Sequence, residues 1–491
     1  MMSELAVHGG AAVAVLLVLP LLTAALALVI PVVRVVAPVN ALSSLLSLLA
    51  AFTLLGARPE PGPFIQVDDF SVVMLTLTTF VAFTSSLFSA GYVGYERCAG
   101  RLTSNGERLY HVMYQCLMFA LNLALLANNI GLMWVAIELA TLTAVLMVGL
   151  YRTPQALEAA WKYFMLGSVG VALALFGTIL VYFAAAGAVG EGLEAMSWTV
   201  LVARAGAFEP SLLNLAFVFL LLGYGTKMGL APMHAWLPDA HAEGPTPITA
   251  VLSGLLINVS LYVVLRFKMV LAASPQALPP GPLMIGLGLL SVTIATLMLY
   301  RRRDIKRLFA YSSIEHMGIA AFAFGMGGPL ANFAGLLHMA MHSLTKSAIF
   351  FAVGHIVQVK GSQQISDIRG LSESHPVLGW GLTMGVLAIA GMPPFGVFTS
   401  EFMLISATFA RAPVPTLILI AGLLVALGAL LLRLNEMVFG EPVFSELAGG
   451  KEPFSGTVLP LTLHLILVLV AGLWLPPPLV AWFQHIAALL G

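Results

Sequence analysis

The sequence has little charge. Only 9% of its 491 residues are Asp, Glu, Lys or Arg, whereas 60% are hydrophobic and the mean hydropathy is +0.99. A soluble domain has about 25% charged residues. A chain this apolar cannot cover itself with polar surface in water, so we expect an all-α integral membrane protein. The formal net charge is zero and no charged tail is present, so nothing favours a nucleic-acid partner.

Cysteine is also scarce, and the motifs of cofactor binding are missing. Cys98 and Cys116 are the only two cysteines, and they form no CxxC pair. No GxGxxG or Walker A pattern occurs. We therefore expect no cofactor and no metal in this chain, and redox chemistry that drives it would occur in another chain. No Lys or Arg precedes the first apolar run, near Ala11, so that run is expected to be a retained span.

Long apolar runs dominate what is present. A bilayer-spanning helix needs about 20 such residues. Fourteen runs meet this length, and they cover residues 9–30, 36–57, 70–95, 110–128, 130–150, 158–186, 211–235, 246–270, 281–300, 308–327, 331–358, 377–410, 414–440 and 457–484. The even count places both termini on one side of the membrane.

Basic residues favour one set of loops, and this bias predicts the orientation. Loops after odd-numbered spans contain fourteen: Arg34, Arg97, Arg101, Arg108, Arg152, Arg301, Arg302, Arg303, Lys306, Arg307, Lys360, Arg369, Arg433 and Lys451. The other side contains five: Arg58, Arg204, Arg266, Lys268 and Arg411. We expect the odd-span loops to face the cytoplasm of a bacterial or archaeal inner (plasma) membrane, with both termini outside.

Two spans are interrupted by proline and glycine. Span seven is broken within residues 227–238, and span twelve within 391–396. Proline removes a backbone donor, and non-helical backbone at membrane depth occurs where protein or a cavity surrounds it. Paired broken helices are typical of inverted-repeat transporters.

The breaks lie five spans apart, so spans four to eight are predicted to repeat, inverted, as spans nine to thirteen. The expected domains are N-terminal helices 1–3 (1–109), a first half-channel (110–270), a second half-channel (271–440) and a C-terminal helix 14 (441–491).

Ionisable residues inside the first half are the first candidates for function. A charge at the bilayer centre costs between about 2.5 and 17 kcal/mol, so such residues rarely persist without a role. Glu138, in the middle of span five, is a protonated acid bound to a carbonyl, a proton site, or the partner of a buried lysine. Lys162 either reaches the membrane surface or pairs with Glu138. Lys227 precedes the break of span seven and either forms a structural ion pair or exchanges a proton with a carboxylate.

The second half contains a histidine-rich candidate. His338, His342 and Lys346 recur at every fourth residue of span eleven, which places them on one helical stripe about 12 Å long. A proton wire explains this stripe better than packing, and better than a zinc site without further ligands. Glu315 and His316 in span ten point about 100° apart, which favours only one of them facing the interior.

The repeat pairs these residues across the halves. Glu401 follows the break of span twelve and would correspond to Lys227. Lys346 would correspond to Lys162, and the Glu315/His316 region to Glu138.

A polar segment follows the first break. Asp239, His241 and Glu243 come directly after Pro238, at the end of span seven that is predicted to be cytoplasmic. They are either a route for proton uptake or an ordinary polar loop. The basic run 301–307 is interpreted as a topology signal.

Three stretches resemble a known family. They are 227–246 (KMGLAPMHAWLPDAHAEGPT), 304–318 (DIKRLFAYSSIEHMG) and 391–402 (GMPPFGVFTSEF). They are similar to signatures of the antiporter-like subunits of respiratory complex I, Mrp-type sodium/proton antiporters and membrane-bound hydrogenases. Residues 138–145, 151–154 and 159–168 resemble most the hydrogenase-4, or formate hydrogenlyase, component F subunit.

The resemblance implies about fourteen helices in two inverted five-helix repeats, with helices seven and twelve discontinuous. It implies a proton path through Glu138, Lys227, the span-eleven histidines and Lys346 to Glu401. Two departures stand out. Asn258 occupies the place of a span-eight lysine and cannot titrate, and Glu315 replaces a small polar residue.

Three functions remain open. The first is a proton-translocating, non-redox subunit of a multi-subunit redox complex, working beside other antiporter-like subunits and a hydrophilic module with iron–sulfur or nickel–iron centres. The second is a subunit of a Mrp-type Na⁺/H⁺ antiporter without redox chemistry. The third is a solitary transporter of an organic solute, which the strung-out charges do not favour.

Overall fold

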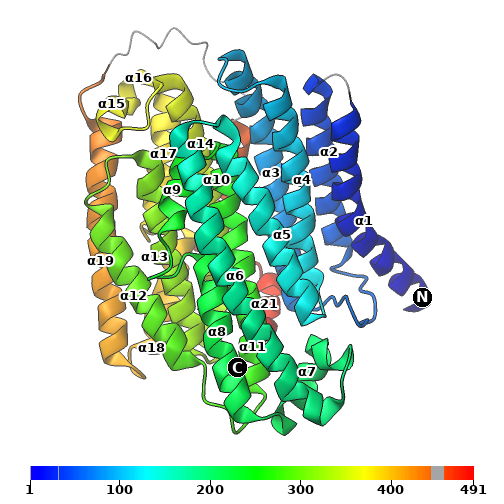
Figure 1. The fold of residues 1–491 in the computed structure, drawn as a ribbon. Helices are drawn as coiled ribbons and strands as arrows, with labels where there is room; N and C mark the ends of the chain where they lie inside the picture. Colours follow the sequence, from blue (N-terminus) through cyan, green and yellow to red (C-terminus); the bar gives the residue numbers. More distant parts are fainter. Residues whose placement is uncertain (1, 31–32, 444–457) are drawn as a thin grey trace.

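The computed structural model describes residues 2–30, 33–443 and 458–491, and this part of the chain is built from helices. The helices form an upright bundle, and both marked ends of the chain lie in its lower half (Figure 1). The main helices are α1 (Met2–Val29), α2 (Val33–Thr53), α3 (Asp69–Cys98), α4 (Ser104–Leu126), α5 (Ile130–Val148), α6 (Pro154–Val189), α8 (Pro210–Met228), α9 (Trp236–Glu243), α10 (Thr246–Val251), α11 (Ile257–Ala272), α12 (Gly281–Leu299), α13 (Ile305–Met326), α14 (Pro329–Lys360), α17 (Pro376–Ile389), α18 (Gly396–Thr408), α19 (Pro413–Leu434), α20 (Val458–Leu473) and α21 (Pro477–Leu489).

Local sequence signals set many helix boundaries. Asn129 caps α5 by accepting a hydrogen bond from the Leu132 amide at 3.0 Å. Thr153 caps α6 in the same way, and Pro154 occupies its first position, where the missing N–H is harmless. Short elements connect the long ones: η1 (Gly149–Tyr151), η2 (Glu194–Met196), α7 (Trp198–Arg204), η3 (Ala205–Ala207), α15 (Ile365–Ile368) and α16 (Leu371–Ser374).

The number of spans differs from the expectation. Eleven described helices are long and apolar enough to cross a membrane, or twelve if α20 and α21 are counted as one span. The predicted count of fourteen is therefore not confirmed. Span ten corresponds to α13, and span twelve to the short halves α17 and α18. The span predicted at 457–484 is interrupted, because α20 and α21 are bent by 80° where three consecutive prolines begin at Pro476.

Both predicted helix breaks are confirmed. The first lies between Met228, the last residue of α8, and Trp236, the first of α9, and Gly229 ends α8 with a left-handed φ of 77°. The second lies between Ile389 of α17 and Gly396 of α18. The polypeptide thus leaves helical geometry twice inside the bundle.

Two of the five basic residues counted on the outer side are buried inside a helix. Arg266 in α11 is 1% exposed and donates to both carboxylate oxygens of Asp68, at 2.6 and 2.7 Å. Lys268 donates to the Leu490 carbonyl at 2.6 Å. These two residues therefore tie α11 to other elements, which weakens their use as orientation signals. Lys451, another of the counted residues, lies outside the described residues.

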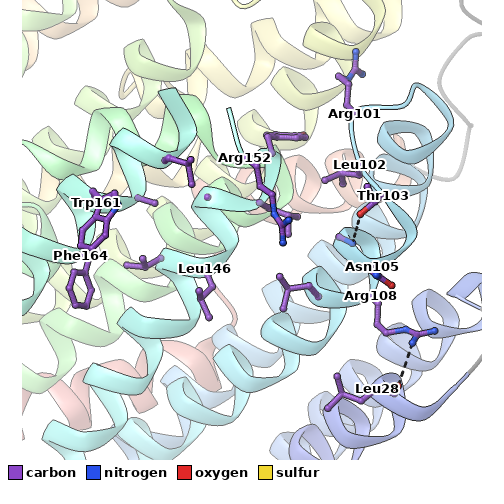
Figure 2. Close-up of a pocket in the computed structure, with 18 residues that line it drawn as sticks. Leu28, Arg101, Leu102, Thr103, Asn105, Arg108, Leu146, Arg152, Trp161 and Phe164 are labelled. Carbon is purple, nitrogen blue, oxygen red and sulfur yellow. Dashed lines mark hydrogen bonds between the residues drawn. The ribbon is translucent and has the colours of Figure 1, made fainter. Parts of the chain in front are cut away.

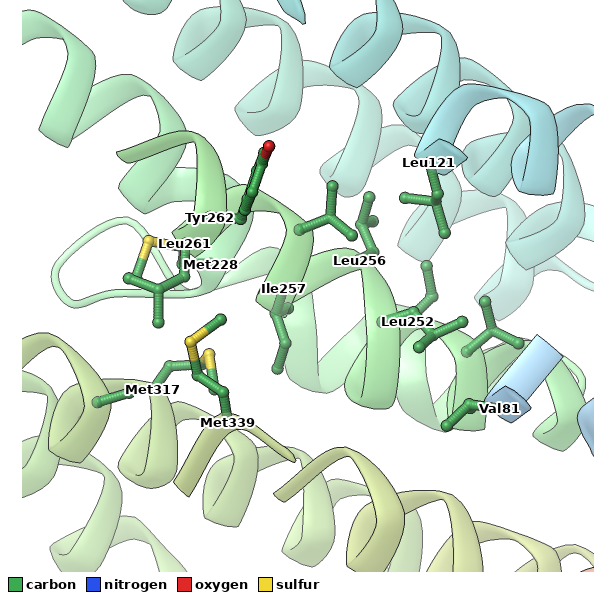
Figure 3. Close-up of a cluster of buried hydrophobic side chains, with 14 of the residues drawn as sticks. Val81, Leu121, Met228, Leu252, Leu256, Ile257, Leu261, Tyr262, Met317 and Met339 are labelled. Carbon is green, nitrogen blue, oxygen red and sulfur yellow. The ribbon is translucent and has the colours of Figure 1, made fainter. Parts of the chain in front are cut away.

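The centre of the bundle is the span of α10, the π-helical turn η4 (Leu252–Leu256) and α11, whose most apolar stretch is completely buried. Met228 of α8, Met317 of α13 and Met339 of α14 meet around Ile257 of α11 (Figure 3). Met228 follows Lys227 and Met339 follows His338 in the sequence. An apolar cluster therefore includes residues adjacent in sequence to ionisable residues of both halves.

Candidate functional site

A buried lysine and a half-buried glutamate face each other in the first half. Lys227 lies in the last turn of α8 and is fully buried, and its Nζ is 5.4 Å from the ring centre of Tyr163. Glu138 of α5 is its electrostatic partner. Among the described residues, neither Lys227 Nζ nor Glu138 Oε2 has a hydrogen-bond partner. We call Glu138, Tyr163 and Lys227 the first cluster.

The local packing leaves space for this ammonium group. The end of a helix favours a cation, because the last carbonyls carry partial negative charge. Trp236 donates from Nε1 to the Thr226 carbonyl at 2.7 Å and stacks on Tyr163, with ring centres 4.1 Å apart. A Cβ atom on Gly167 would come within 2.6 Å of Lys227 Nζ, so the glycine provides the room that the lysine occupies.

Lys162 lies away from this cluster. Its side chain is 47% exposed and forms ion pairs with Glu158 at 2.6 Å and Asp239 at 3.1 Å. The interpretation that pairs it with Glu138 is wrong. The other interpretation, in which it extends to the surface, describes its position. Lys346, its predicted counterpart in the second half, is fully buried, so the two lysines differ in exposure.

The three candidate residues that follow the first break, Asp239, His241 and Glu243, do not lie together. Asp239 and Glu243 bind Arg307 of α13 at 2.7 and 3.4 Å, near the surface. His241 is fully buried against Phe350 of α14, with ring centres 5.6 Å apart, and lies close enough to Lys346 for an electrostatic interaction. Neither of its ring nitrogens has a partner among the described residues. His241 therefore extends from the first half toward the second.

The histidines of the second half form a hydrogen-bonded row. His316 Nδ1 of α13 lies 3.1 Å from His338 Nε2 of α14, and His338 Nδ1 lies 3.0 Å from Ser400 Oγ of α18. The ring centre of His342 is 5.5 Å from that of His316. His316 thus contacts both His338 and His342, and Lys346 lies within electrostatic reach of His342, which confirms that the three residues share one face of α14.

Charged groups flank this row. Lys346 donates to the Phe309 carbonyl at 2.8 Å and interacts electrostatically with the buried Glu315. The expectation that only one of Glu315 and His316 faces the interior is wrong. Both are at most 2% exposed, because α13 is covered on all sides at this level.

Glu401 is buried in α18, one residue beyond Ser400. Its carboxylate lies against Gly391, where a Cβ would collide with Oε2 and where φ is 66°. Both features require glycine at the second break. We call the set Glu315, His316, His338, His342, Lys346 and Glu401 the second cluster.

The second cluster includes a possible ligand set for a metal. One donor atom from each of His316, His338 and Glu401 lies within 4.8 Å of the other two, and all three residues are buried. Two imidazoles and a carboxylate are donors that Zn²⁺ accepts. The expectation that no metal belongs to this chain stays a prediction.

Asn258 connects the two halves through the backbone of α14. Its Nδ2 donates to the Met339 carbonyl at 3.0 Å and to Ser343 Oγ at 2.6 Å, while its buried Oδ1 has no partner among the described residues. In the preceding π turn, the Ile257 amide donates to the Leu252 carbonyl. The side chain that stands in place of a lysine therefore binds α14 between two turns of the histidine stripe.

Lys306 was missed, because the run 301–307 was interpreted as a topology signal. Its Nζ donates to the Ala242 and Gly244 carbonyls at 2.8 and 2.6 Å and so covers the end of α9. It also lines a cavity of about 360 Å³ together with Glu96, Tyr151 and Glu243. A signal existed: Asp304 is an N-cap that starts α13 at residue 305, which places Lys306 in the helix.

The geometry defines an integral membrane protein with discontinuous helices and buried ionisable groups. Similarity to known proteins agrees with this description. Residues 127–428 match the family described as NADH:quinone oxidoreductase/Mrp antiporter, transmembrane. The chain is 59% identical over 437 residues to a hydrogenase-4 component F homolog of Methylacidiphilum infernorum, covering 89% of this chain and 91% of that protein. It is 26% identical to NADH-quinone oxidoreductase subunit N of Chlorobium chlorochromatii, covering 85% and 86%.

A solved structure shares the fold. A chain of the membrane-bound sulfane sulfur reductase, an archaeal respiratory membrane complex, aligns with a TM-score of 0.83 at 24% identity and covers 97% of both chains. The protein belongs to the NADH:quinone oxidoreductase/Mrp antiporter family of membrane subunits.

Proposed function

We propose that this chain translocates protons as a non-redox membrane subunit of a multi-subunit redox complex of the hydrogenase or NADH dehydrogenase type. The observation that carries the proposal is Lys227, a fully buried lysine whose ammonium group has no hydrogen-bond partner among the described residues and whose electrostatic partner, Glu138, lies on another helix. An ammonium group held this loosely can give up and regain its proton as the distance to the carboxylate changes.

The proposed path has two half-channels, 110–270 and 271–440. In the first, Glu138 and Lys227 exchange the proton. In the second, the hydrogen-bonded row from His316 through His338 to Ser400 supports transfer toward Glu401. Glu315, His342 and Lys346 adjust the charge along that row.

Proton transfer through both half-channels needs a link between them. Met228, Met317 and Met339 make the direct route apolar. His241 lies against α14 within electrostatic reach of Lys346, which favours it over Asn258 as the titratable link. Asn258 contributes its unpartnered Oδ1 as a fixed acceptor for water. Lys162, Asp239 and Glu243 form the charged outer end of this route, beside the cavity lined by Lys306.

The surroundings of the chain follow from the same proposal. The odd-span loops face the cytoplasm of a bacterial or archaeal inner membrane, and both termini lie outside. Other antiporter-like subunits and a hydrophilic module with iron–sulfur or nickel–iron centres are the partners, and no cofactor binds this chain. The similarity to a hydrogenase-4 component F homolog and to an NADH-quinone oxidoreductase subunit N supports this placement.

The alternative is a Na⁺/H⁺ antiporter subunit without redox chemistry, since the matched family includes Mrp antiporters. Ion movement would then continue without an electron donor. Neighbouring genes for a hydrogenase large subunit would favour the redox complex, and a cluster of small antiporter genes would favour the alternative.

The test is ion flux in inside-out vesicles that contain the assembled complex. Proton uptake and ²²Na⁺ movement are measured with and without the electron donor of the partner subunits, for wild type and Lys227→Met. We expect donor-dependent proton movement that the substitution abolishes.

Lys268→Met is the matched control, because Lys268 is a buried lysine whose ammonium binds the Leu490 carbonyl outside both clusters. Proton movement that still depends on the electron donor in Lys227→Met would contradict the proposal. Sodium movement independent of the donor would favour the antiporter.

A further inference from the structure

A cavity lies outside both clusters. It measures about 810 Å³ and opens between the ends of α1 and α5 and the starts of α4 and α6 (Figure 2). Its lining comes from the ends of spans one and five and from the loop after span three, so it lies at the end of the bundle that the basic residues mark. Nothing in the proposed proton path uses it.

One rim of the cavity is cationic. Arg108 and Arg152 line it, and no described acidic residue forms an ion pair with either. Arg108 donates instead to the Ile30 carbonyl at 2.8 Å, and its buried Nε has no partner. Arg101 differs, because Glu96 neutralises it through two hydrogen bonds of 2.7 Å. None of the lining residues is acidic, so two guanidinium charges remain without a counterion.

Arg152, one of the two arginines, has an unfavourable backbone conformation. Arg152 has a φ of 55°, and it is the only residue other than glycine with a positive φ in the described part of the chain. The left-handed conformation is unfavourable for a residue with a side chain and commonly marks a functional position. In Figure 2 the Arg152 side chain lies between the Arg108 side and the Trp161 side of the cavity.

The other walls are apolar and exposed. Leu146 of α5 is 54% exposed, Trp161 of α6 is 63% exposed, and Leu28 of α1 is 60% exposed. These side chains lie near the ends of helices that are long and apolar enough to cross a membrane. Tryptophan is favoured at the boundary between headgroups and acyl chains. A ligand that fits this site has an anionic group at one end and hydrocarbon at the other.

We propose that this cavity binds one anionic phospholipid. The guanidinium groups of Arg108 and Arg152 hold the phosphate, and the acyl chains lie on Leu146, Trp161 and Leu28. Basic pockets between membrane helices suit such headgroups, and guanidinium matches phosphate geometry in a bidentate fashion. Free phosphate would use only the rim, and an acidic peptide would leave the lipid-facing walls uncovered.

The bound lipid would fill the space between α4 and α6 beside the end of α5, the helix that contains Glu138. Gly149 and Leu150, which follow α5 directly, line the same cavity. The site therefore touches the helix of the first cluster without touching its ionisable groups.

The first experiment measures lipid that copurifies. The full chain is purified from membranes together with its associated subunits, and retained phosphatidylglycerol and cardiolipin are quantified by mass spectrometry. We expect at least one anionic lipid per chain in wild type, and about fivefold weaker retention for each of Arg108→Gln and Arg152→Gln, as one basic side chain near an anionic surface contributes. Arg301→Gln is the control, because Arg301 is an exposed arginine of another odd-span loop that does not line the cavity.

The second experiment places the lipid. Vesicles are prepared with brominated phosphatidylglycerol or brominated phosphatidylcholine, and tryptophan quenching is compared between wild type and Trp161→Phe. Brominated phosphatidylglycerol should quench the fluorescence contributed by Trp161, and brominated phosphatidylcholine should quench it far less. After Arg152→Gln, quenching by phosphatidylglycerol should require about fivefold more of this lipid.

Three results would overturn the proposal. Equal lipid loss in Arg301→Gln would mean general attraction to the surface. Quenching that does not depend on the headgroup would mean ordinary annular lipid. Displacement of the lipid by inorganic phosphate alone would mean that the apolar walls contribute nothing.

Discussion

The two halves of the molecule surround their broken helices with different neighbours. In the first half, α8 packs on α6 through glycines: a Cβ on Gly170 would come within 2.7 Å of Thr226, and one on Gly177 within 2.7 Å of Leu220. In the second half, Gly396 of α18 also lies tightly against Met341 of α14, but these two helices are joined in addition by the contact between His338 and Ser400. Small residues let helix backbones approach closely, whereas imidazoles hold them apart and fill the space with donors and acceptors.

This difference suggests two ways to move a proton. The first cluster has few polar groups and no hydrogen bond between Glu138 and Lys227, so transfer there depends on a change of distance or on water. The second cluster already contains hydrogen bonds between His316, His338 and Ser400. If both operate in series, damage to either half stops the whole path, and the sensitivity to small changes differs.

The largest effect is expected from removing the lysine of the second half. Lys346→Met should abolish donor-dependent proton uptake, with a loss of about a hundredfold or more, because a positioned acid–base group contributes at least that much. The measurement is the vesicle assay used for Lys227→Met. Retained pumping in one of the two variants would show that the halves do not act in series.

The second-largest effect is expected from a metal ion that binds the second cluster and not the first. We expect added Zn²⁺ to inhibit proton uptake by binding His316, His338 and Glu401, whose donors no described set in the first half matches. Binding of ⁶⁵Zn²⁺ to the purified complex should weaken at least about tenfold in His338→Ala. His355→Ala, at a buried histidine outside the cluster, is the control. Unchanged binding in His338→Ala would contradict the assignment.

A steric change should affect the first cluster more mildly. Gly167→Ala places a methyl group where Lys227 Nζ now lies, and the flexible side chain can shift aside. Proton uptake should fall a few-fold, as expected for about 1 kcal/mol. Gly177→Ala, a change on the same helix that meets Leu220 instead, should lower stability and leave the rate per folded complex unchanged. Equal rates in the two variants would argue against a role for the position of the ammonium group.

The smallest effect on transport is expected at the ion pair in which both carboxylate oxygens of Asp68 accept hydrogen bonds from Arg266. Burial alone would raise the pKa of the Asp68 carboxyl, but the Arg266 guanidinium lowers that pKa from 3.8 to about 2. The pair therefore contributes stability that is complete above pH 4 and is lost as the pH falls toward 2.

Asp68→Asn should cost about 2 kcal/mol at neutral pH and leave proton uptake per folded complex intact. The measurements are thermal unfolding in detergent from pH 7 to pH 3 and the vesicle assay. Asp367→Asn, at an exposed residue of the short helix α15, is the control. A transport defect in Asp68→Asn would mean that the ion pair between Asp68 and Arg266 also belongs to the proton path.

Features encoded by neighbouring residues could be predicted from the sequence. The breaks near Pro232 and Pro394 were predicted because proline and glycine act locally, and the stripe from His338 to Lys346 because helical spacing is fixed. The bend at Pro476 also has a local signal, the run of three prolines, but the length of an apolar run does not reveal it.

Features that depend on how helices are rotated against one another could not be predicted. Successive residues differ by about 100° around a helix, so Asp239 reaches the surface while His241, two residues later, faces α14. Lys162 and Lys306 show the same limit, since one sits at a helix end that is open to the surface and the other at an end that is buried.

The π turn before Asn258 has a consequence for the register of α11. A π turn is an α-helix with one additional residue in the turn, and five residues here occupy the place of four. Every side chain after it is rotated by about 100° relative to an uninterrupted helix. Deleting one residue within 252–256 would restore ordinary helix and turn Asn258 away from Ser343. The hydrogen bond between Asn258 and Ser343 thus depends on a single inserted residue. The insertion or deletion of one codon is enough to create or remove this contact.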